Sequence, residues 1–90
     1  MSAAGRRAFI LCYRRGSGSQ SEHYVLLEVE GVRSREEASH LVGRKVVWVR
    51  PDGRSFVGRI VRAHGGRGRV IARFRRPLPG QALGTQAVVL

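Results

Sequence analysis

The segment RIVRAHGGRGRVIARFRR, residues 59–76, predicts two β-strands joined by a glycine-rich turn. Side chains alternate between the two faces of a strand, so Val70, Ala72 and Phe74 share one face of the second strand. The opposite face carries three arginines, Arg69, Arg73 and Arg75. Ile71 alone breaks the alternation. We therefore predict a β-hairpin that buries one apolar row and exposes a row of guanidinium groups to solvent.

The turn of this hairpin contains Gly65, Gly66 and Gly68, which permit positive φ angles and a close approach of the backbone to a partner. Arginine suits phosphate groups, because its planar guanidinium donates hydrogen bonds in pairs. Our hypothesis is that the hairpin grips a nucleic-acid backbone. The alternative interpretation is a solvated strand face with a flexible turn.

The charge of the chain is high and uneven. Its 90 residues suit one domain, and 42% of them are hydrophobic, as in an ordinary globular fold, despite the net charge of +11. Residues 1–52 hold nine basic and six acidic side chains, whereas residues 53–90 hold eight arginines and no acid. This imbalance favours a polyanionic partner, nucleic acid above all, for the carboxy-terminal half. A membrane surface would require a basic amphipathic helix, and the sequence predicts none.

Cys12 is the single cysteine, so no disulfide is expected within the chain, and a reducing cytosolic compartment fits best. We predict a first strand that begins at Arg6 or Arg7 and ends at Arg14, and we predict that the thiol of Cys12 lies in the core, because Cys12 shares one face of this strand with Ala8 and Ile10. That strand is apolar on both faces, which predicts cover on both sides. Residues 1–5 are expected to be frayed. No apolar run of about 18 residues and no signal-peptide pattern is present, so we expect neither a membrane span nor secretion by that route.

Further strands are predicted at residues 23–30, 44–50, 55–63 and 85–90, and a flexible loop at residues 15–21. Val25, Leu27 and Val29 should face the core, while Glu28 and Glu30 should be exposed beside arginines.

One short helix is predicted after the second of these strands. Ser34 and Glu37 form a capping-box pattern, in which Ser34 caps the helix and Glu37 reaches back to the amide of Ser34. The helix is expected to run to Leu41 or Val42, with Gly43 as the closing C′ residue.

Two strand residues have alternative interpretations. Trp48 is predicted in the core, although an exposed tryptophan would be able to stack on a base. Gly58 indicates either a β-bulge or a close crossing of two backbones.

About six short strands and one short α-helix, separated by glycine or proline turns, predict a mainly β fold. We expect a small antiparallel β-barrel formed by residues 1–90 as a single RNA-binding domain. Closure of the barrel also removes exposed sheet edges from a chain rich in β-formers.

The sequence does not predict an enzyme. Ser55 and His64 have no acid near them in sequence other than Asp52, which lies in a predicted turn. The lone cysteine and the three histidines lack the close ligand pairs of common zinc sites. Residues 65–68 are too short for the phosphate-binding loop of a nucleotidase. No metal and no cofactor are therefore expected, and His64 is predicted as either a structural turn residue or an RNA contact.

The motifs VRAHG at residues 61–65 and GRVIARFR at residues 68–75, followed by LP at 78–79 and Gly84, together resemble the signature of one ribosomal family. EGV at residues 30–32, SREEA at 34–38 and GRKV at 43–46 resemble it as well. This is the L35Ae family of large-subunit ribosomal proteins, found in archaea and eukaryotes. The resemblance extends from Phe9 to Leu90. Two departures are a shorter connection at residues 51–54 and the absence here of the short tail that members usually carry after the closing strand.

The resemblance implies a barrel of the translation-protein or SH3-like kind, without catalytic activity, in the large subunit of the cytoplasmic ribosome. It implies binding to large-subunit ribosomal RNA as a monomer beside neighbouring ribosomal proteins, with no membrane and no small-molecule substrate. The arginine bias suggests an archaeal source, and it is also explained by bidentate phosphate recognition, a GC-rich genome or heat adaptation. The predicted RNA-binding residues are Arg44, Lys45, Arg59, Arg62, His64, Gly65, Gly66, Arg67, Arg69, Arg73, Arg75 and Arg76.

Two other functions fit the residues. In the first alternative, the barrel binds transfer RNA or a translation factor in isolation. In the second, the barrel binds other proteins, and its charge serves only to keep it soluble.

Overall fold

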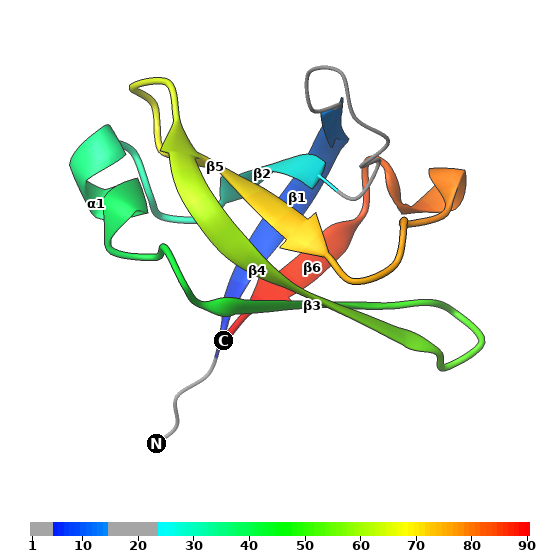
Figure 1. Cartoon of the computed structure of the whole chain (residues 1–90). Helices are drawn as coiled ribbons and strands as arrows, with labels where there is room; N and C mark the ends of the chain where they lie inside the picture. Colours follow the sequence, from blue (N-terminus) through cyan, green and yellow to red (C-terminus); the bar gives the residue numbers. More distant parts are fainter. Residues whose placement is uncertain (1–4, 15–23) are drawn as a thin grey trace.

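Within residues 5–14 and 24–90, which the computed structural model describes, six β-strands close into an antiparallel barrel (Figure 1). The strands are β1 Arg6–Arg14, β2 Tyr24–Val29, β3 Lys45–Val49, β4 Ser55–His64, β5 Arg69–Phe74 and β6 Gln86–Val89. Their order around the barrel is β1-β2-β5-β4-β3-β6, and every neighbouring pair is antiparallel. The predicted mainly β barrel with one short helix is confirmed. The frayed end predicted at residues 1–5 and the loop predicted at residues 15–21 fall wholly or mostly outside the described residues.

The core of the barrel follows from the period-two pattern of β2 and β5. Val70 and Ala72 are fully buried, and Phe74 is 1% exposed, so the apolar row predicted on β5 does face inward. The predicted inward row of β2 is buried as well: Val25, Leu27 and Val29. Glu28 and Glu30 are exposed, each beside an arginine, as expected.

A β-bulge in β1 changes the predicted faces of its second half. Ile10 is the register partner of Leu27, but the next partner pair is Cys12 with Leu26, so Leu11 is an extra residue. The bulge interrupts the alternation, and Cys12 is exposed rather than in the core, which corrects our prediction. Phe9 and Leu11 are also 40% and 37% exposed, so the outer face of β1 is not covered as expected.

A second bulge lies in β4. Ile60 pairs with Ala72 and Arg62 pairs with Ile71, which leaves Val61 without a partner on β5. Arg62 is therefore exposed on the outer face, while Ala63 turns inward. Bulges bend a strand and increase its twist, which helps a six-stranded sheet to close.

Gly58 marks a close backbone crossing and not the bulge. A Cβ atom at this position would lie 2.6 Å from the carbonyl oxygen of Arg73 and 2.8 Å from Cγ of Phe74. Of the two predicted alternatives for Gly58, a β-bulge or a close crossing of two backbones, the structure therefore has the close crossing.

Trp48 packs in the core, as predicted, and does not offer its ring to a base. Its side chain is 3% exposed, its Nε1–H donates to Oγ1 of Thr85 at 2.8 Å, and its ring centroid lies 5.4 Å from that of Phe56. A buried indole needs such a partner for its N–H group.

The helix α1, Arg35–Ser39, is shorter than predicted. The Oγ of Ser34 accepts from the amide of Glu37 at 3.2 Å, which confirms the N-cap. The carboxylate of Glu37 accepts from the amide of Arg33 at 2.9 Å, one residue before the predicted partner. This hydrogen bond is the main cause that lowers the pKa of Glu37 below its ordinary value of 4.5, and a hydrogen bond from the predicted partner, the amide of Ser34, lowers it further. Residues 40–43 form turns, so Gly43, at φ +93°, is not the C′ residue.

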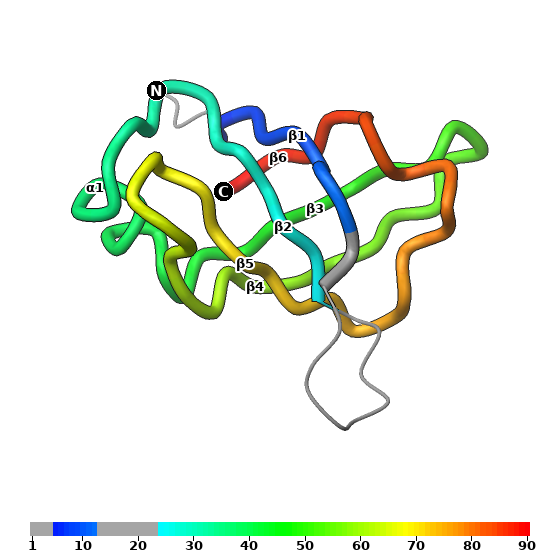
Figure 2. The backbone as a smooth tube through the Cα atoms, turned by 90° about the horizontal axis from the view of Figure 1, so that it is seen from above, coloured from blue at the N-terminus to red at the C-terminus, as the bar shows by residue number. Residues whose placement is uncertain are grey.

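The two ends of the barrel carry different segments. Figures 1 and 2 place α1 beside the β4–β5 turn at one end, and the short 3₁₀ helix η1, Gly80–Ala82, at the other. The β3–β4 turn lies near the same end as η1. The predicted turn at residues 51–54 is present, with Gly53 at φ +99° and its amide donating to the carbonyl of Arg50.

Candidate nucleic-acid interface

Three basic side chains lie in one row across the outside of β3, β4 and β5. Lys45 of β3 is the register partner of Arg59, and Arg59 is in turn the partner of Arg73 on β5. Adjacent strands are about 4.8 Å apart, so the three Cα atoms span about 10 Å. Like charges directly opposite each other destabilise a sheet. The row therefore favours a function that brings an anion to this face.

Acidic side chains do not neutralise this row in the part of the chain that the structure describes. The ion pairs there join Arg7 to Glu30 at 3.9 Å, Arg50 to Asp52 at 3.5 Å and Arg69 to Glu28 at 3.8 Å. None of these pairs includes a member of the row. The acids gather on β2, on α1 and in the β3–β4 turn, away from the row on β3, β4 and β5.

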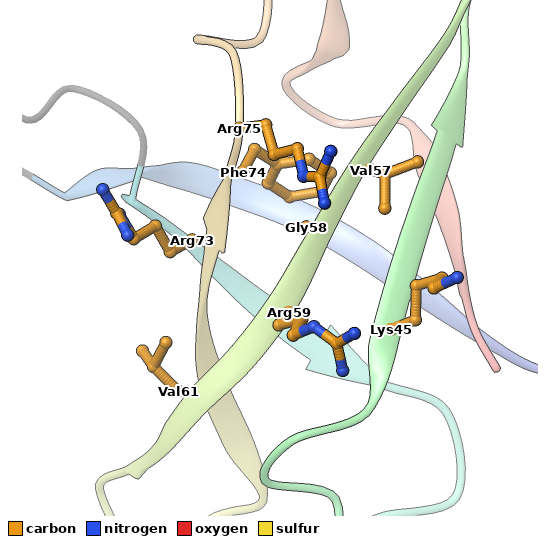
Figure 3. A pocket seen from close by; sticks show the side chains of 8 residues that line it. All are labelled: Lys45, Val57, Gly58, Arg59, Val61, Arg73, Phe74 and Arg75. Carbon is orange, nitrogen blue, oxygen red and sulfur yellow. The ribbon is translucent and has the colours of Figure 1, made fainter.

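The row borders a groove of about 660 Å³ on the outside of β3, β4 and β5 (Figure 3). We call it the cationic groove, and its lining residues are Lys45, Val57, Gly58, Arg59, Val61, Arg73, Phe74 and Arg75. Figure 3 shows Arg73 and Lys45 extending to opposite sides of the groove, with Arg59 between them. The Nη1 of Arg59 donates to the carbonyl of Gly43 at 3.1 Å, which holds this guanidinium in place before any ligand arrives.

The lining of the cationic groove is mixed, with more polar than apolar surface. Val57 and Val61 lie on the outside of β4, two residues before and after Arg59, and Val61 is 40% exposed. Gly58 belongs to the inward row, where its missing side chain leaves room for the ring of Phe74. The outer face of β4 therefore alternates valine, arginine and valine.

The β4–β5 turn forms a second basic surface. Gly65, Gly66 and Arg67 are exposed at its tip, and Nη1 of Arg35 donates to the carbonyl of Gly65 at 3.5 Å. Gly65 has φ +70°, as expected for such a turn, whereas Gly66 does not have a positive φ. His64, before the turn, is half-buried.

Gly68 closes this turn against the segment after β2. It has φ +89°, and a Cβ atom there would lie 2.3 Å from the carbonyl oxygen of Val32. Gly68 is therefore a packing position of the fold and not a point of approach for a ligand.

The remaining predicted contacts do not line the cationic groove. Arg69 lies on the outside of β5, as predicted, but forms an ion pair with Glu28. Arg44 donates to the carbonyl of Leu90 at 3.4 Å and lines a different pocket of about 340 Å³ at the α1 end. Arg62 is exposed on the outside of β4, and Arg76 is exposed just after β5. The predicted residues thus lie in the cationic groove, in the β4–β5 turn and at positions outside both, and they do not form one continuous surface of the hairpin alone.

Sequence reasoning did not identify the valines as part of this surface. Their signal was present, because Val57, Arg59 and Val61 alternate on the outer face of one predicted strand. The alternation alone does not say that a groove forms there, since this depends on how β3, β4 and β5 curve together.

No helix within the described residues is long and apolar enough to cross a membrane. No group of three or more histidine, cysteine, aspartate or glutamate side chains in the same residues is arranged to hold a metal ion.

Comparison with known proteins adds independent information. The model of the family described as "Ribosomal protein L35Ae" matches residues 6–90. The chain is 44% identical over 85 residues to the large ribosomal subunit protein eL33 of Methanopyrus kandleri, covering 93% of this chain and 94% of that protein. It is 35% identical over 98 residues to eL33 of Caenorhabditis elegans, covering 93% and 79%. It is 36% identical over 93 residues to eL33 of Dictyostelium discoideum, covering 93% and 89%.

Proposed function

Because the chain belongs to the ribosomal protein L35Ae family, we propose that it is a structural constituent of the large ribosomal subunit that binds ribosomal RNA through the cationic groove. The family resemblance seen in the sequence motifs is confirmed by the comparisons. The family supports a structural role in the cytoplasmic ribosome, and we propose no catalytic step for the chain.

The observation that carries the RNA-binding proposal is the uncompensated row of Lys45, Arg59 and Arg73. A free protein gains nothing from placing three cations opposite one another on adjacent strands. Phosphate groups of RNA would neutralise the row and release the counterions that otherwise surround the polyanion. The repulsion present in the free protein would then be relieved on assembly.

Arg75 adds a fourth cation to the groove, and its amide donates to the carbonyl of Val57 at 3.1 Å. This hydrogen bond continues the β4–β5 pairing beyond the end of β5, so Arg75 emerges from ordered backbone. Arginine forks on a rigid sheet lose little freedom when they bind a phosphate in two parallel hydrogen bonds.

The exposed tip at Gly65, Gly66 and Arg67 supplies a second contact point at the α1 end of the barrel. Two separated basic surfaces on one small domain suit a protein that lies between segments of folded RNA. Arg62, exposed on β4 between them, extends the basic surface from the groove toward the tip.

The salt dependence of binding tests the groove. We would measure the affinity of the purified protein for large-subunit ribosomal RNA over a series of KCl concentrations, for wild type and for the triple variant Arg59→Gln, Arg73→Gln and Arg75→Gln. Each lost phosphate contact should reduce the slope of log affinity against log salt by about 0.7–0.9, so the triple variant should lose about 2–3 slope units.

A matched control removes the same net charge elsewhere. The triple variant Arg7→Gln, Arg33→Gln and Arg50→Gln changes exposed or half-buried arginines outside the cationic groove. It should keep a slope close to that of wild type. If both triple variants had equal slopes, the RNA would contact the protein outside the cationic groove. Binding to free transfer RNA as tight as to ribosomal RNA would instead favour a role outside the subunit.

A further inference from the structure

We propose that the outer face of β1 and β6 docks a neighbouring protein of the large subunit, through a segment that carries apolar side chains and a basic side chain. This surface, which we call the apolar face, consists of Phe9 and Leu11 on β1, Val88 on β6 and the half-buried Val47 on β3. The inference rests on the proposed function, because it places the chain beside other proteins of the subunit. It goes further, since it assigns a surface and a chemistry to a partner other than RNA.

The side chains of the apolar face form one continuous patch. Phe9 and Val88 are each 40% exposed, and Leu11 is 37% exposed. Val88 is the register partner of Val47 on β3 and of Arg7 on β1. Phe9, two residues after Arg7, therefore lies diagonally across from Val88, at about 7–8 Å, which is within reach of an aromatic ring. Single exposed apolar residues are ordinary on a protein surface, whereas a contiguous patch is a mark of an interaction site.

The bulge in β1 adds to this patch. Strict alternation after Ile10 would expose Leu11 and bury Cys12, but the register shifts between Ile10 and Cys12, and both Leu11 and Cys12 are exposed. Bulges commonly redirect a side chain in this way. The thiol of Cys12 therefore lies on the outer surface, next in the chain to a residue of the apolar face.

The charges that border the apolar face do not favour RNA. Phe9 is the register partner of Glu28 on β2, and Glu28 lies 3.8 Å from Arg69. Glu30 lies 3.9 Å from Arg7. These four charged side chains have no net charge, so a phosphate gains little attraction from them and is repelled by the two carboxylates. Its charge also gains nothing from the phenylalanine ring and the methyl groups.

The same carboxylates indicate the chemistry of the partner. The side chains of Glu28 and Glu30 are 52% and 62% exposed, and their distances to arginine are longer than a hydrogen bond. A carboxylate offers about four acceptor sites, so a lysine or arginine of the partner would bind there while its apolar side chains cover the patch. A second copy of this chain is disfavoured, because each copy has a net charge of +11.

The position of the apolar face allows RNA and protein to bind together. In the ring of strands, β1 lies opposite β4 and β6 lies opposite β5. Figure 2 shows this separation, with β1 and β6 on one side of the barrel and β4 and β5 on the other. β3 joins the two surfaces, since Lys45 lines the cationic groove and Val47 belongs to the apolar face.

Cys12 reports on this surface without any substitution, because it is the single cysteine and is exposed. We would compare the rate at which its thiol reacts with a maleimide in the free protein and in purified large subunits that contain the protein. A docked partner should slow the reaction by more than about tenfold, since the reactivity of a thiol depends on its exposure. Equal rates would overturn the inference, because the face would then be open to solvent in the subunit.

Cross-linking identifies what covers the face. The protein is labelled at Cys12 with a benzophenone maleimide, incorporated into large subunits and irradiated. We expect a product that resists ribonuclease and contains a peptide of another protein. The matched control carries the label in the cationic groove, in the double variant Cys12→Ser and Val61→Cys, and should cross-link to RNA. A cross-link from Cys12 to RNA, or to a second copy of this chain, would overturn the inference.

Two valine substitutions separate docking from RNA binding. Val88→Gln places a polar side chain in the apolar face, and it should reduce retention in large subunits by about threefold or more in competition with wild type, because burial of valine is lost. Val42→Gln is the matched control, since Val42 is 46% exposed and belongs to neither surface. Both variants should bind isolated large-subunit RNA as wild type does.

The outcomes distinguish this inference from the proposed function. Equal retention of Val88→Gln and Val42→Gln would overturn the inference. So would a loss of RNA affinity by Val88→Gln at an unchanged Tm, because RNA would then contact the apolar face. If the wild-type protein neither bound large-subunit RNA nor entered large subunits, the result would instead count against the proposed function itself.

Discussion

Replacing Arg73 by glutamine should make the free protein more stable, although it should weaken RNA binding. Arg73 lies directly opposite Arg59, and Lys45 continues the row on the next strand. Glutamine keeps most of the length of the side chain and its polarity, so the main change is the loss of one charge from a repulsive pair.

The magnitude follows from this register. A cross-strand pair of charges contributes about 0.2–1 kcal/mol, and the sign is unfavourable for like charges. Coulomb repulsion in water between two unit charges falls from about 0.6 kcal/mol at 7 Å to about 0.3 kcal/mol at 14 Å, within that range. A gain of about 0.5 kcal/mol in the free energy of unfolding corresponds to an increase of about 2–4 °C in Tm for a domain of this size.

Thermal unfolding followed by circular dichroism would measure the change at low and high salt. Near 1 M salt the Debye length is about 3 Å, so the repulsion is screened and the gain of Arg73→Gln should disappear. Arg7→Gln is the control, because β1 and β4 lie on opposite sides of the ring of strands and Arg7 pairs with Glu30 at 3.9 Å. It lowers the net charge equally but relieves no repulsive pair, and it should change stability by less than about 0.5 kcal/mol without a gain.

Two results would refute this reasoning. If Arg73→Gln and Arg7→Gln raised Tm equally, the gain would come from the overall charge and not from the row. If the gain of Arg73→Gln persisted at high salt, it would come from a change in strand propensity or packing.

Three further predictions concern the fold. Gly68→Ala should lower the free energy of unfolding by more than about 2 kcal/mol, because the added methyl group clashes with backbone at a residue with positive φ. Gly53→Ala is the control, since Gly53 has φ +99° with open space around it, and it should lower the free energy of unfolding by only about 1 kcal/mol in chemical denaturation. Thr85→Val should cost about 1–3 kcal/mol, since it leaves the buried Nε1–H of Trp48 without its acceptor, and near-ultraviolet circular dichroism should show the altered tryptophan environment. Glu37→Gln should lower stability at neutral pH, and the difference from wild type should shrink as the pH falls below 4.5, because the folded state lowers the pKa of this carboxyl and its contribution is present only when it is ionised. A pH titration of Tm that showed a constant difference would contradict the last prediction.

The predicted faces of β2, β3 and β5 were correct because each depends on local alternation alone. Val25, Leu27 and Val29, like Val46 and Trp48, occupy successive inward positions without interruption. The N-cap at Ser34 was equally local, since it depends on residues only three positions apart. For the same reason the sequence showed that Arg73 and Arg75 would lie on the outer face.

The burial of Cys12 was predicted wrongly, and the larger of the two backbone partners of Glu37 was missed, for a different reason. The bulge at Leu11 is an adjustment of β1 to its neighbours, and no residue in the segment requires it. The carboxylate of Glu37 accepts from the amide of Arg33 in addition to the predicted amide of Ser34, and this second partner depends on how the chain enters α1.

The sequence alone thus determined which side chains point outward, because the two-residue alternation of a strand depends only on residues next to each other in the chain. Only the closed barrel decided which of those outward side chains meet. Lys45, Arg59 and Arg73 come into one row because pairing register, bulges and curvature join three strands that are separate in the chain. Register is a property of strand pairs and of the ring that they close, and alternation within a single strand carries no information about it.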